Sequence, residues 1–186
     1  YWELDIDVNE DIDENYAISK LRSSMENAVK LQMISDVPIG SFLSGGLDTS
    51  TIVAFASKVS DKPINTFCMG FGEKTDEFEY ARVVADKFNT IHKELVVKFD
   101  LFKEFPKMIW HIDMPKRNLY PYLIYKEVAK HLKVIHSGMG GDELLGGYVH
   151  RYAYMEYAAN KKAKNRTIAH NKLFSKFEYE GKLSKV

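Results

Sequence analysis

Short apolar runs alternate along this chain with segments in which apolar residues recur every three or four positions. The runs predict strands, and the periodic segments predict amphipathic helices. An alternation of this kind favours βαβ units and therefore an α/β fold, a parallel sheet with helices on both faces. In such a sheet, ligands bind beyond the carboxyl ends of the strands. The expected strands are 39–43, 64–70, 94–97 and 133–136, and the expected helices are 16–33, 49–59, 77–88, 99–110 and 122–131.

The turn after the first expected strand carries the most informative residues of the chain, Ser44-Gly45-Gly46-Leu47-Asp48-Thr49-Ser50. Two glycines let the main chain turn tightly and approach a ligand closely. The helix that follows presents unpaired N–H groups and the positive end of its dipole, and Thr49 and Ser50 add hydroxyl donors. Together these groups suit phosphate or pyrophosphate. Asp48 beside such an anion suggests a bridging cation such as Mg²⁺.

Other interpretations of this turn are weaker or less specific. The Walker loop requires a lysine that is missing after Gly46, and the spacing of the glycines is not that of the dinucleotide-binding fingerprint. The structural alternative is an ordinary strand-to-helix turn, with glycine for its geometry and Asp48 or Thr49 as the helix N-cap.

A second glycine-rich segment, 137–148, follows the last expected strand and contains five glycines around Asp142-Glu143. Glycine at this density costs conformational entropy, so it points to a main chain that approaches something closely. Both glycine-rich segments leave the carboxyl ends of strands, so the parallel sheet predicts that they face each other. The alternative is a flexible turn in which Asp142 caps a helix.

These segments resemble known sequence patterns. Residues 44–50 are similar to the S-G-G-x-D-S-S pyrophosphate loop of the N-type ATP pyrophosphatases, with Thr49 in place of a serine. Residues 137–148 resemble the S-G-(E/D)-G-(A/G)-D-E-(L/I)-F-G-G-Y signature of the asparagine synthase family. The resemblance extends over residues 1 to 152, including 35–40 and 66–71. Two motifs in the right order are far more specific than either alone.

The resemblance implies an adenine-nucleotide alpha-hydrolase-like fold that binds ATP and Mg²⁺. In that family the domain adenylates a carboxylate, aspartate in asparagine synthetase, and ammonia from a glutaminase domain then displaces AMP. By position, Asp48 and Asp142 are the expected Mg²⁺ ligands. The residues expected to bind ATP are Phe42, Ser44, Gly45, Gly46, Asp48, Thr49, Ser50, Met69, Ser137 and Gly138, with main chain at Phe42, Met69 and Gly138 lining the adenosine.

Met139 departs from the family pattern, which has Glu or Asp at this position. A thioether cannot act as a general base or hold an ammonium ion. No downstream lysine matches the family's catalytic lysine, so the catalytic residues stay unassigned. The leading hypothesis is an ATP-dependent amide-forming ligase, and the alternative is a catalytically impaired nucleotide-binding homologue. A tRNA-modifying or GMP-forming enzyme with the same loop is disfavoured by the specific 137–148 segment.

Composition adds bounds to these expectations. The 186 residues carry a formal net charge of zero, which gives no support for binding to nucleic acid or to an anionic membrane. Cys68 is the only cysteine, which fits a reducing cytoplasm. We expect residues 1–15 to be a linker from a preceding domain, which in this family would be a glutaminase, 16–160 to be the synthetase domain, and 161–186 to be a helical or irregular tail. A homodimer is also expected.

Overall fold

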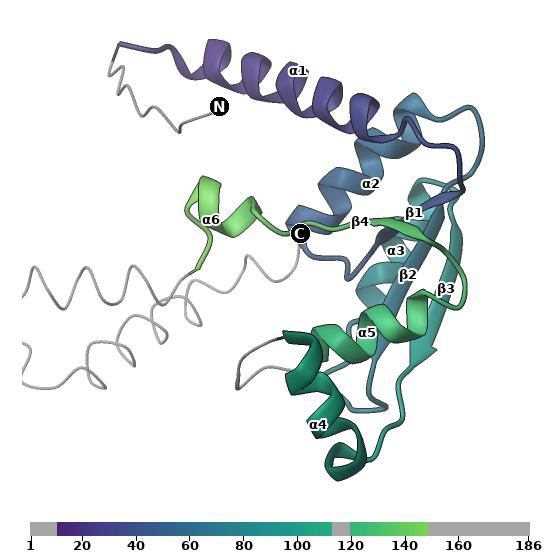
Figure 1. The fold of residues 1–186 in the computed structure, drawn as a ribbon. Coiled ribbons are helices and arrows are strands. Elements are labelled where there is room, and N and C mark those ends of the chain that lie inside the picture. Colours follow the sequence, from purple (N-terminus) through teal and green to yellow (C-terminus); the bar gives the residue numbers. More distant parts are fainter. Residues whose placement is uncertain (1–10, 113–119, 149–186) are drawn as a thin grey trace, which may run out of the picture. The chain divides into compact units, whose positions relative to one another are not determined.

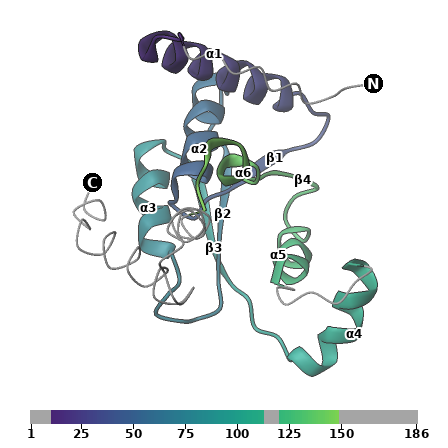
Figure 2. The ribbon, with the colours of Figure 1, turned by 90° about the vertical axis from the view of Figure 1, so that its left-hand side faces the viewer.

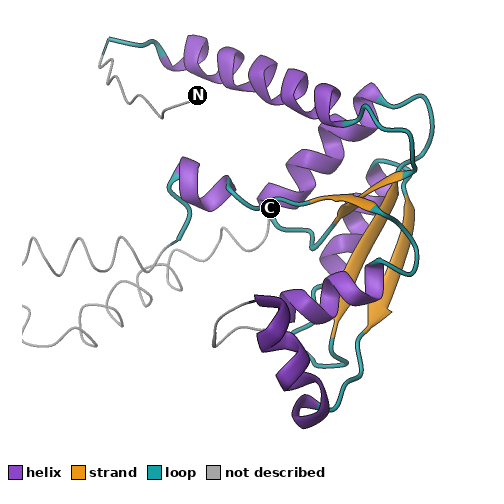
Figure 3. Ribbon diagram, in the orientation of Figure 1, coloured by secondary structure: helices purple, strands orange, loops and turns teal. Residues whose placement is uncertain are grey.

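The computed structural model of the protein describes residues 11–112 and 120–148 (Figure 1). The chain divides into two compact units, 1–138 and 139–186. The first unit contains the whole sheet and the helices that cover it, as the colouring by secondary structure shows (Figure 3). The only described helix of the second unit is the short helix α6, Gly141–Leu145.

Four parallel strands form the sheet in the order β3-β2-β1-β4. The central strand β1 pairs Phe42 with Phe67 of β2 on one side and Ser41 with His136 of β4 on the other. The strand order reverses between β1 and β4, and such a reversal is where ligands bind in open α/β sheets. The strands are β1 Ile39–Phe42, β2 Asn65–Gly70, β3 Ile91–Val96 and β4 Val134–His136.

Helices cover both faces of this sheet, which confirms the predicted α/β architecture. Figure 2 shows α2 and α3 on one side of the strands and α5 on the other. Because side chains alternate along a strand, Leu43 and Cys68 face α2 and α3, whereas Phe42 faces α5. The helices are α1 Glu14–Gln32, α2 Leu47–Val59, α3 Phe78–Lys87, α4 Leu101–Ile112 and α5 Tyr120–Val128.

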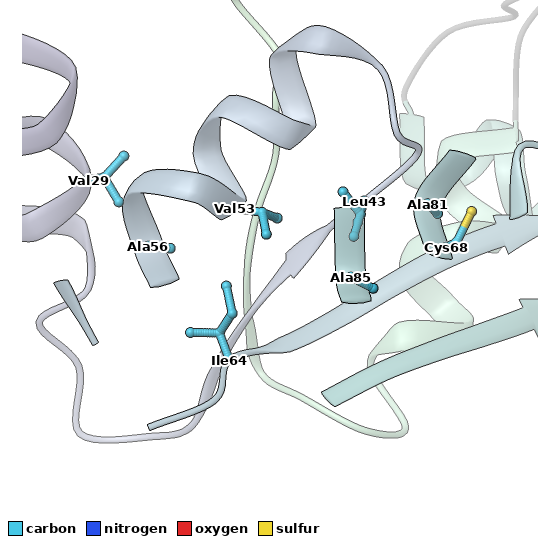
Figure 4. Packing of buried hydrophobic residues seen from close by; sticks show 8 residues of the cluster. All are labelled: Val29, Leu43, Val53, Ala56, Ile64, Cys68, Ala81 and Ala85. Atoms are coloured by element: carbon cyan, nitrogen blue, oxygen red, sulfur yellow. The ribbon is translucent and has the colours of Figure 1, made fainter. Parts of the chain in front are cut away.

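The main hydrophobic core lies between the sheet and helices α1, α2 and α3 (Figure 4). Burying an aliphatic side chain of valine or leucine size contributes about 1.5–3 kcal/mol, so this cluster is a large stabilising element. The salt bridge between Lys58 and Glu26, 2.7 Å long, joins α2 to α1 at the surface. The buried residues are Val29, Leu43, Val53, Ala56, Ile64, Cys68, Ala81 and Ala85.

Aromatic and aliphatic side chains fill the opposite face. The Phe42 ring meets the Tyr125 ring of α5 edge-on at a centroid distance of 5.5 Å. Val97, Met108 and Leu123 form a second buried cluster. These contacts place α5 against this face of the sheet and pack α4 on α5.

Helix α3 is also tied to the edge strand β3. The guanidinium of Arg82 donates two hydrogen bonds to the Glu94 carboxylate, from Nε at 2.6 Å and from Nη2 at 2.9 Å. This pairing holds the pKa of the Glu94 carboxyl below its usual range. A two-pronged bond of this kind fixes direction as well as distance, and it links α3 to β3 at the surface.

Cys68 is a small buried side chain. It is a free thiol, 2% exposed, and burial raises its pKa to about 11. The thiol therefore stays protonated and inert near neutral pH. No helix in the described residues is long and apolar enough to cross a membrane.

Some predicted boundaries were wrong by two or three residues. Helix α2 begins at Leu47 and not at 49, strand β3 begins at Ile91 and not at 94, and α5 begins at Tyr120 and not at 122. The predicted tail at 161–186 lies outside the described residues. The division into 1–15, 16–160 and 161–186 stays a prediction.

Candidate functional site

The glycine-rich turn Ser44–Gly46 connects the carboxyl end of β1 to α2. Gly45 has a positive φ of 84°, in the left-handed region that favours glycine. A Cβ atom at Gly45 would lie 2.5 Å from both the carbonyl carbon and the Cβ of Tyr80, and 2.8 Å from the Ala81 nitrogen. The turn is therefore pressed against the main chain of α3, which gives it a rigid backing.

We expect Gly45→Ala to lower the free energy of unfolding by about 1–3 kcal/mol from backbone strain alone, with a further cost from the clash with α3. Gly46→Ala is the matched control, because its φ of −67° is ordinary and its new Cβ would meet only the Ser44 hydroxyl, at 3.3 Å. Denaturant unfolding of the two variants checks this. Equal losses of stability would contradict the predicted role of Gly45.

Two hydroxyl groups close the turn on itself. Thr49 Oγ1 accepts the Ser44 N–H at 3.2 Å and donates to the Gly46 carbonyl at 3.3 Å. Ser44 Oγ lies 3.1 Å from Thr49 Oγ1 and accepts the Gly46 N–H at 3.2 Å. Either hydroxyl can be the donor in the Ser44–Thr49 pair. The conformation of the turn is thus fixed by its own side chains.

The start of α2 offers donors that the turn does not use. The first helical hydrogen bond runs from the Ser50 N–H to the Gly46 carbonyl, so the three N–H groups before it have no partner within the helix. Gly46 is the N-cap, and it makes no side-chain cap. The suggestion that Asp48 or Thr49 caps this helix is therefore wrong. Leu47 is 83% exposed, which leaves this end of the helix open to an incoming anion.

The hydroxyl of Ser50 is an orphaned polar group. Its oxygen is buried and has no hydrogen-bond partner among the described residues. An unsatisfied buried hydroxyl is costly unless something pairs with it. Phosphate oxygens held at the start of α2 would supply that partner, so the site fits a phosphate group on an observation independent of the sequence pattern.

Asp48 lies in the first turn of α2 and is half-buried. Its carboxylate has no hydrogen bond or ion pair with any described residue. A carboxylate beside a phosphate cradle suits Mg²⁺, which takes one or two carboxylates and completes its octahedron with phosphate oxygens and water. The part of the chain that the structure describes has no group of three or more His, Cys, Asp or Glu side chains that would hold a metal unaided.

The start of the second glycine-rich segment lies against the first. Gly138 follows β4, and a Cβ atom placed on it would lie 2.9 Å from both the Cβ of Asp48 and the nitrogen of Thr49. Ser137 is its immediate neighbour in the chain. Gly138 and Asp48, 90 positions apart in sequence, thus meet at the carboxyl edge of the sheet.

Phe42 and Met69, two of the positions expected to line an adenosine, also lie at this edge, and their half-buried side chains pack against neighbouring residues. Phe42 ends β1 and packs on Tyr125, while Met69 lies one residue before the end of β2 and packs against the cluster of Val97, Met108 and Leu123. Main chain, and not side chain, is therefore what these positions can offer a ligand.

The second unit shows how the Gly-Asp-Glu segment is built. Glu143 accepts the Gly140 N–H at 2.9 Å and the hydroxyl proton of Tyr148, so its carboxylate has a structural role. Gly140, with a φ of 102°, is the N-cap of α6, so Asp142 is not the cap. Met139 is 79% exposed. The pairing of Asp142 with Asp48 at one metal stays a prediction.

Sequence reasoning missed Asp76, whose carboxylate accepts three main-chain N–H groups in the turn after β2. The available signal was an aspartate a few residues after Gly70-Phe71-Gly72, a pattern typical of side-chain-braced turns. The same turn forms one wall of a shallow hollow of about 430 Å³ at the carboxyl ends of β2 and β3. The hollow is lined by Phe71, Glu73, Val97, Lys98, Phe99 and Tyr120.

Comparison with known proteins identifies relatives over most of the chain. The sequence model of the family described as Asparagine synthase matches residues 20–185. A Methanocaldococcus jannaschii protein named "Putative asparagine synthetase 2", glutamine-hydrolysing, is 40% identical over 80% of this chain. Asparagine synthetase 1 of Bacillus subtilis is 36% identical over 73%, and asparagine synthetase 2 of Arabidopsis thaliana is 34% identical over 76%. Both of these are also named glutamine-hydrolysing.

The matched part covers only 30%, 22% and 26% of those three relatives, respectively. Among solved structures, an NH3-dependent NAD synthetase from Campylobacter jejuni aligns with a TM-score of 0.46 and 15% identity, over 70% of this chain and 60% of that one. That score is too low to establish a shared fold. The family model, which spans residues 20–185, and relatives at 34–40% identity show that the chain belongs to the asparagine synthase family.

Proposed function

We propose that this chain is the synthetase part of an ATP-dependent amide-forming ligase, with ATP and a small carboxylate, aspartate or an analogue, as substrates. The observation that carries the proposal is the contact between Gly138 and the first turn of α2 at Asp48 and Thr49. It brings Ser137-Gly138, the start of the second motif segment, to the open start of α2, and an open helix start at this edge of the sheet suits the phosphates of a nucleotide.

The proposed reaction has two steps. A carboxylate oxygen of the substrate attacks the α-phosphorus of ATP, and the bond from that phosphorus to the β-phosphate oxygen breaks, releasing pyrophosphate. Ammonia then attacks the acyl carbon, loses a proton, and AMP leaves. In this family the ammonia derives from glutamine, so the proposal includes a glutaminase domain in the same protein. A homodimer and a cytoplasmic location are further parts of the proposal.

The chain's own residues have defined roles in this scheme. Ser50 Oγ and the N–H groups at the start of α2 bind the β- and γ-phosphates that leave as pyrophosphate. Ser44 and Thr49 hold the turn in shape, and Asp48 and Asp142 are the residues that would hold Mg²⁺. When bound, that ion would neutralise charge on the leaving pyrophosphate. Main chain at Phe42, Met69 and Gly138 lines the adenosine.

A second candidate function is supported by Met139. Its thioether stands where the family has a carboxylate, and it offers neither a general base nor a partner for an ammonium ion. The second candidate is therefore a nucleotide-binding homologue that retains the site without completing the reaction.

Two measurements on the purified chain separate the candidates. Calorimetric titration with Mg-ATP tests the site, and exchange of labelled pyrophosphate into ATP, with and without aspartate, tests adenylation. We expect ATP binding and aspartate-dependent exchange. Binding without exchange, for aspartate and for a panel of other carboxylates, would favour the second candidate. Absence of Mg-ATP binding would overturn both.

A further inference from the structure

The turn that follows β2 converges on a single side chain. The Phe71 N–H donates to Asp76 Oδ1 at 3.0 Å, and the N–H groups of Gly72 and Glu73 donate to Oδ2 at 2.8 and 3.0 Å. Gly72 has a φ of 81°. Successive N–H groups that point to one spot form a concavity that attracts an anion, and here the protein supplies the anion itself.

The same carboxylate lies close to Gly70, the last residue of β2. A Cβ atom placed on Gly70 would lie 2.5 Å from Asp76 Oδ2 and 2.6 Å from its Cγ. On the other side, the Gly70 carbonyl accepts the Val97 N–H at 2.8 Å. The end of β2 thus lies between the residue that follows β3 and the Asp76 carboxylate.

The hydrogen bonds of the turn also favour the ionised form of the Asp76 carboxyl. The main-chain N–H groups, that of Phe71 first, lower the pKa of the Asp76 carboxyl below its ordinary value. Asp76 is therefore negatively charged near neutral pH. Hydrogen bonds to a carboxylate are stronger than those to a neutral amide, so the charge of Asp76 strengthens its three bonds to the main chain of the turn.

We infer that Asp76 is a positioning residue for the nucleotide: it fixes the main chain at Met69 and Gly70 so that this edge of β2 meets the adenosine end of ATP. The inference rests on the proposed function, in which main chain at Met69 lines the adenosine. Asp76 lies in the β2–α3 connection, whereas the phosphates are bound in the β1–α2 turn. Asp76 bonds directly to the β2–α3 turn, whereas the phosphate turn meets α3 only further along, at Tyr80 and Ala81, so we expect the main effect of Asp76 at the adenosine end.

This separation gives a specific test with Asp76→Asn. Whichever way the amide is turned, its NH2 group faces at least one main-chain N–H, so at least one of the three hydrogen bonds to the turn is lost. We expect the Kd for Mg-ATP to rise about tenfold, because a small displacement of a positioning element has effects of this order or larger. The Kd for Mg-pyrophosphate should not change. The control is Glu77→Gln, which removes the neighbouring charge from a side chain that makes no cap.

Each outcome decides a different question. If the unaltered chain fails to bind Mg-ATP, the proposed function falls and the inference falls with it. If the unaltered chain binds Mg-ATP and Asp76→Asn binds it equally well, only the inference is overturned. Parallel losses of ATP and pyrophosphate affinity would show a general structural role and would also overturn it.

A measurement without substitution covers the case in which Asp76→Asn does not fold. In hydrogen–deuterium exchange of the unaltered chain, Mg-ATP should slow exchange of the amides at 69–73, and Mg-pyrophosphate should not. Equal protection by the two ligands, or none by Mg-ATP, would contradict the assignment of Asp76 to the adenosine end.

Discussion

Asp48→Asn should remove the magnesium dependence of ATP binding. The amide that replaces the carboxylate would keep the shape of the side chain and one oxygen, but it would lose the charge that makes a carboxylate a ligand for Mg²⁺. Removing one partner of a desolvated charge pair costs about 3 kcal/mol, so we expect the Kd for Mg-ATP to rise about 100-fold. Titration of ATP in the presence of Mg²⁺ and of EDTA measures the effect directly.

The magnesium response is the decisive comparison for Asp48. In the unaltered chain, EDTA should weaken ATP binding, whereas in Asp48→Asn, EDTA should make little further difference. Asp61→Asn is the control, because it makes the same change in charge just beyond the other end of α2. Loss of the acidic residue from the first turn of α2 should lower the free energy of unfolding by only about 0.3–1 kcal/mol. A variant that stays folded and still responds to Mg²⁺ would refute the metal assignment.

The sheet could be predicted because its strands are apolar and bounded by turn residues. Strands β1 and β2 match the predicted runs within one residue at each end. Strand β3 is less regular, since it is an edge strand paired only with β2, and exposed positions occur along most of its length. Ile91-His92-Lys93 therefore carries no clear apolar signal, and the predicted strand started too late.

Helix starts were harder to predict because several are set by the main chain. The N-cap of α2 is Gly46, which provides no capping side chain, so the polar residues that follow it suggested a later start. The predicted start of α5 at 122 was also too late, because proline is well suited to the first turn of a helix and α5 begins at Tyr120, one residue before Pro121.

The candidate site was predictable as a set of residues but not as a set of contacts. Sequence identified 44–50 and Ser137-Gly138, and the parallel sheet explains why they meet. It could not reveal that the hydroxyls of Ser44 and Thr49 bond to each other, because that depends on turn geometry. Nor could it show that Asp76 collects three N–H groups, which requires the left-handed Gly72 to fold the turn back.

Gly138→Ala should disrupt the phosphate end of the site. The added Cβ would fall 2.9 Å from the Thr49 nitrogen and 3.1 Å from the Asp48 carbonyl carbon, so it would meet main chain that cannot rotate away. Either the segment after β4 or the first turn of α2 must shift. A displacement of about 1 Å in a positioning element can cost about 100-fold, so we expect the Kd for Mg-ATP to rise by about 10- to 100-fold.

Comparing the affinities for Mg-ATP and Mg-pyrophosphate distinguishes the effect of Gly138→Ala from that of Asp76→Asn. Because the clash is with the start of α2, Gly138→Ala should weaken Mg-pyrophosphate binding along with Mg-ATP binding, whereas Asp76→Asn should spare pyrophosphate. Overpacking should also lower the free energy of unfolding by about 1–3 kcal/mol, which denaturant unfolding will measure. Gly138→Ser and Gly138→Val should cause progressively larger losses of ligand affinity and of stability, because their side chains are progressively larger. If the folded alanine variant binds both ligands normally, the contact between the two motif segments is not what organises the site, and the proposed function loses its main support.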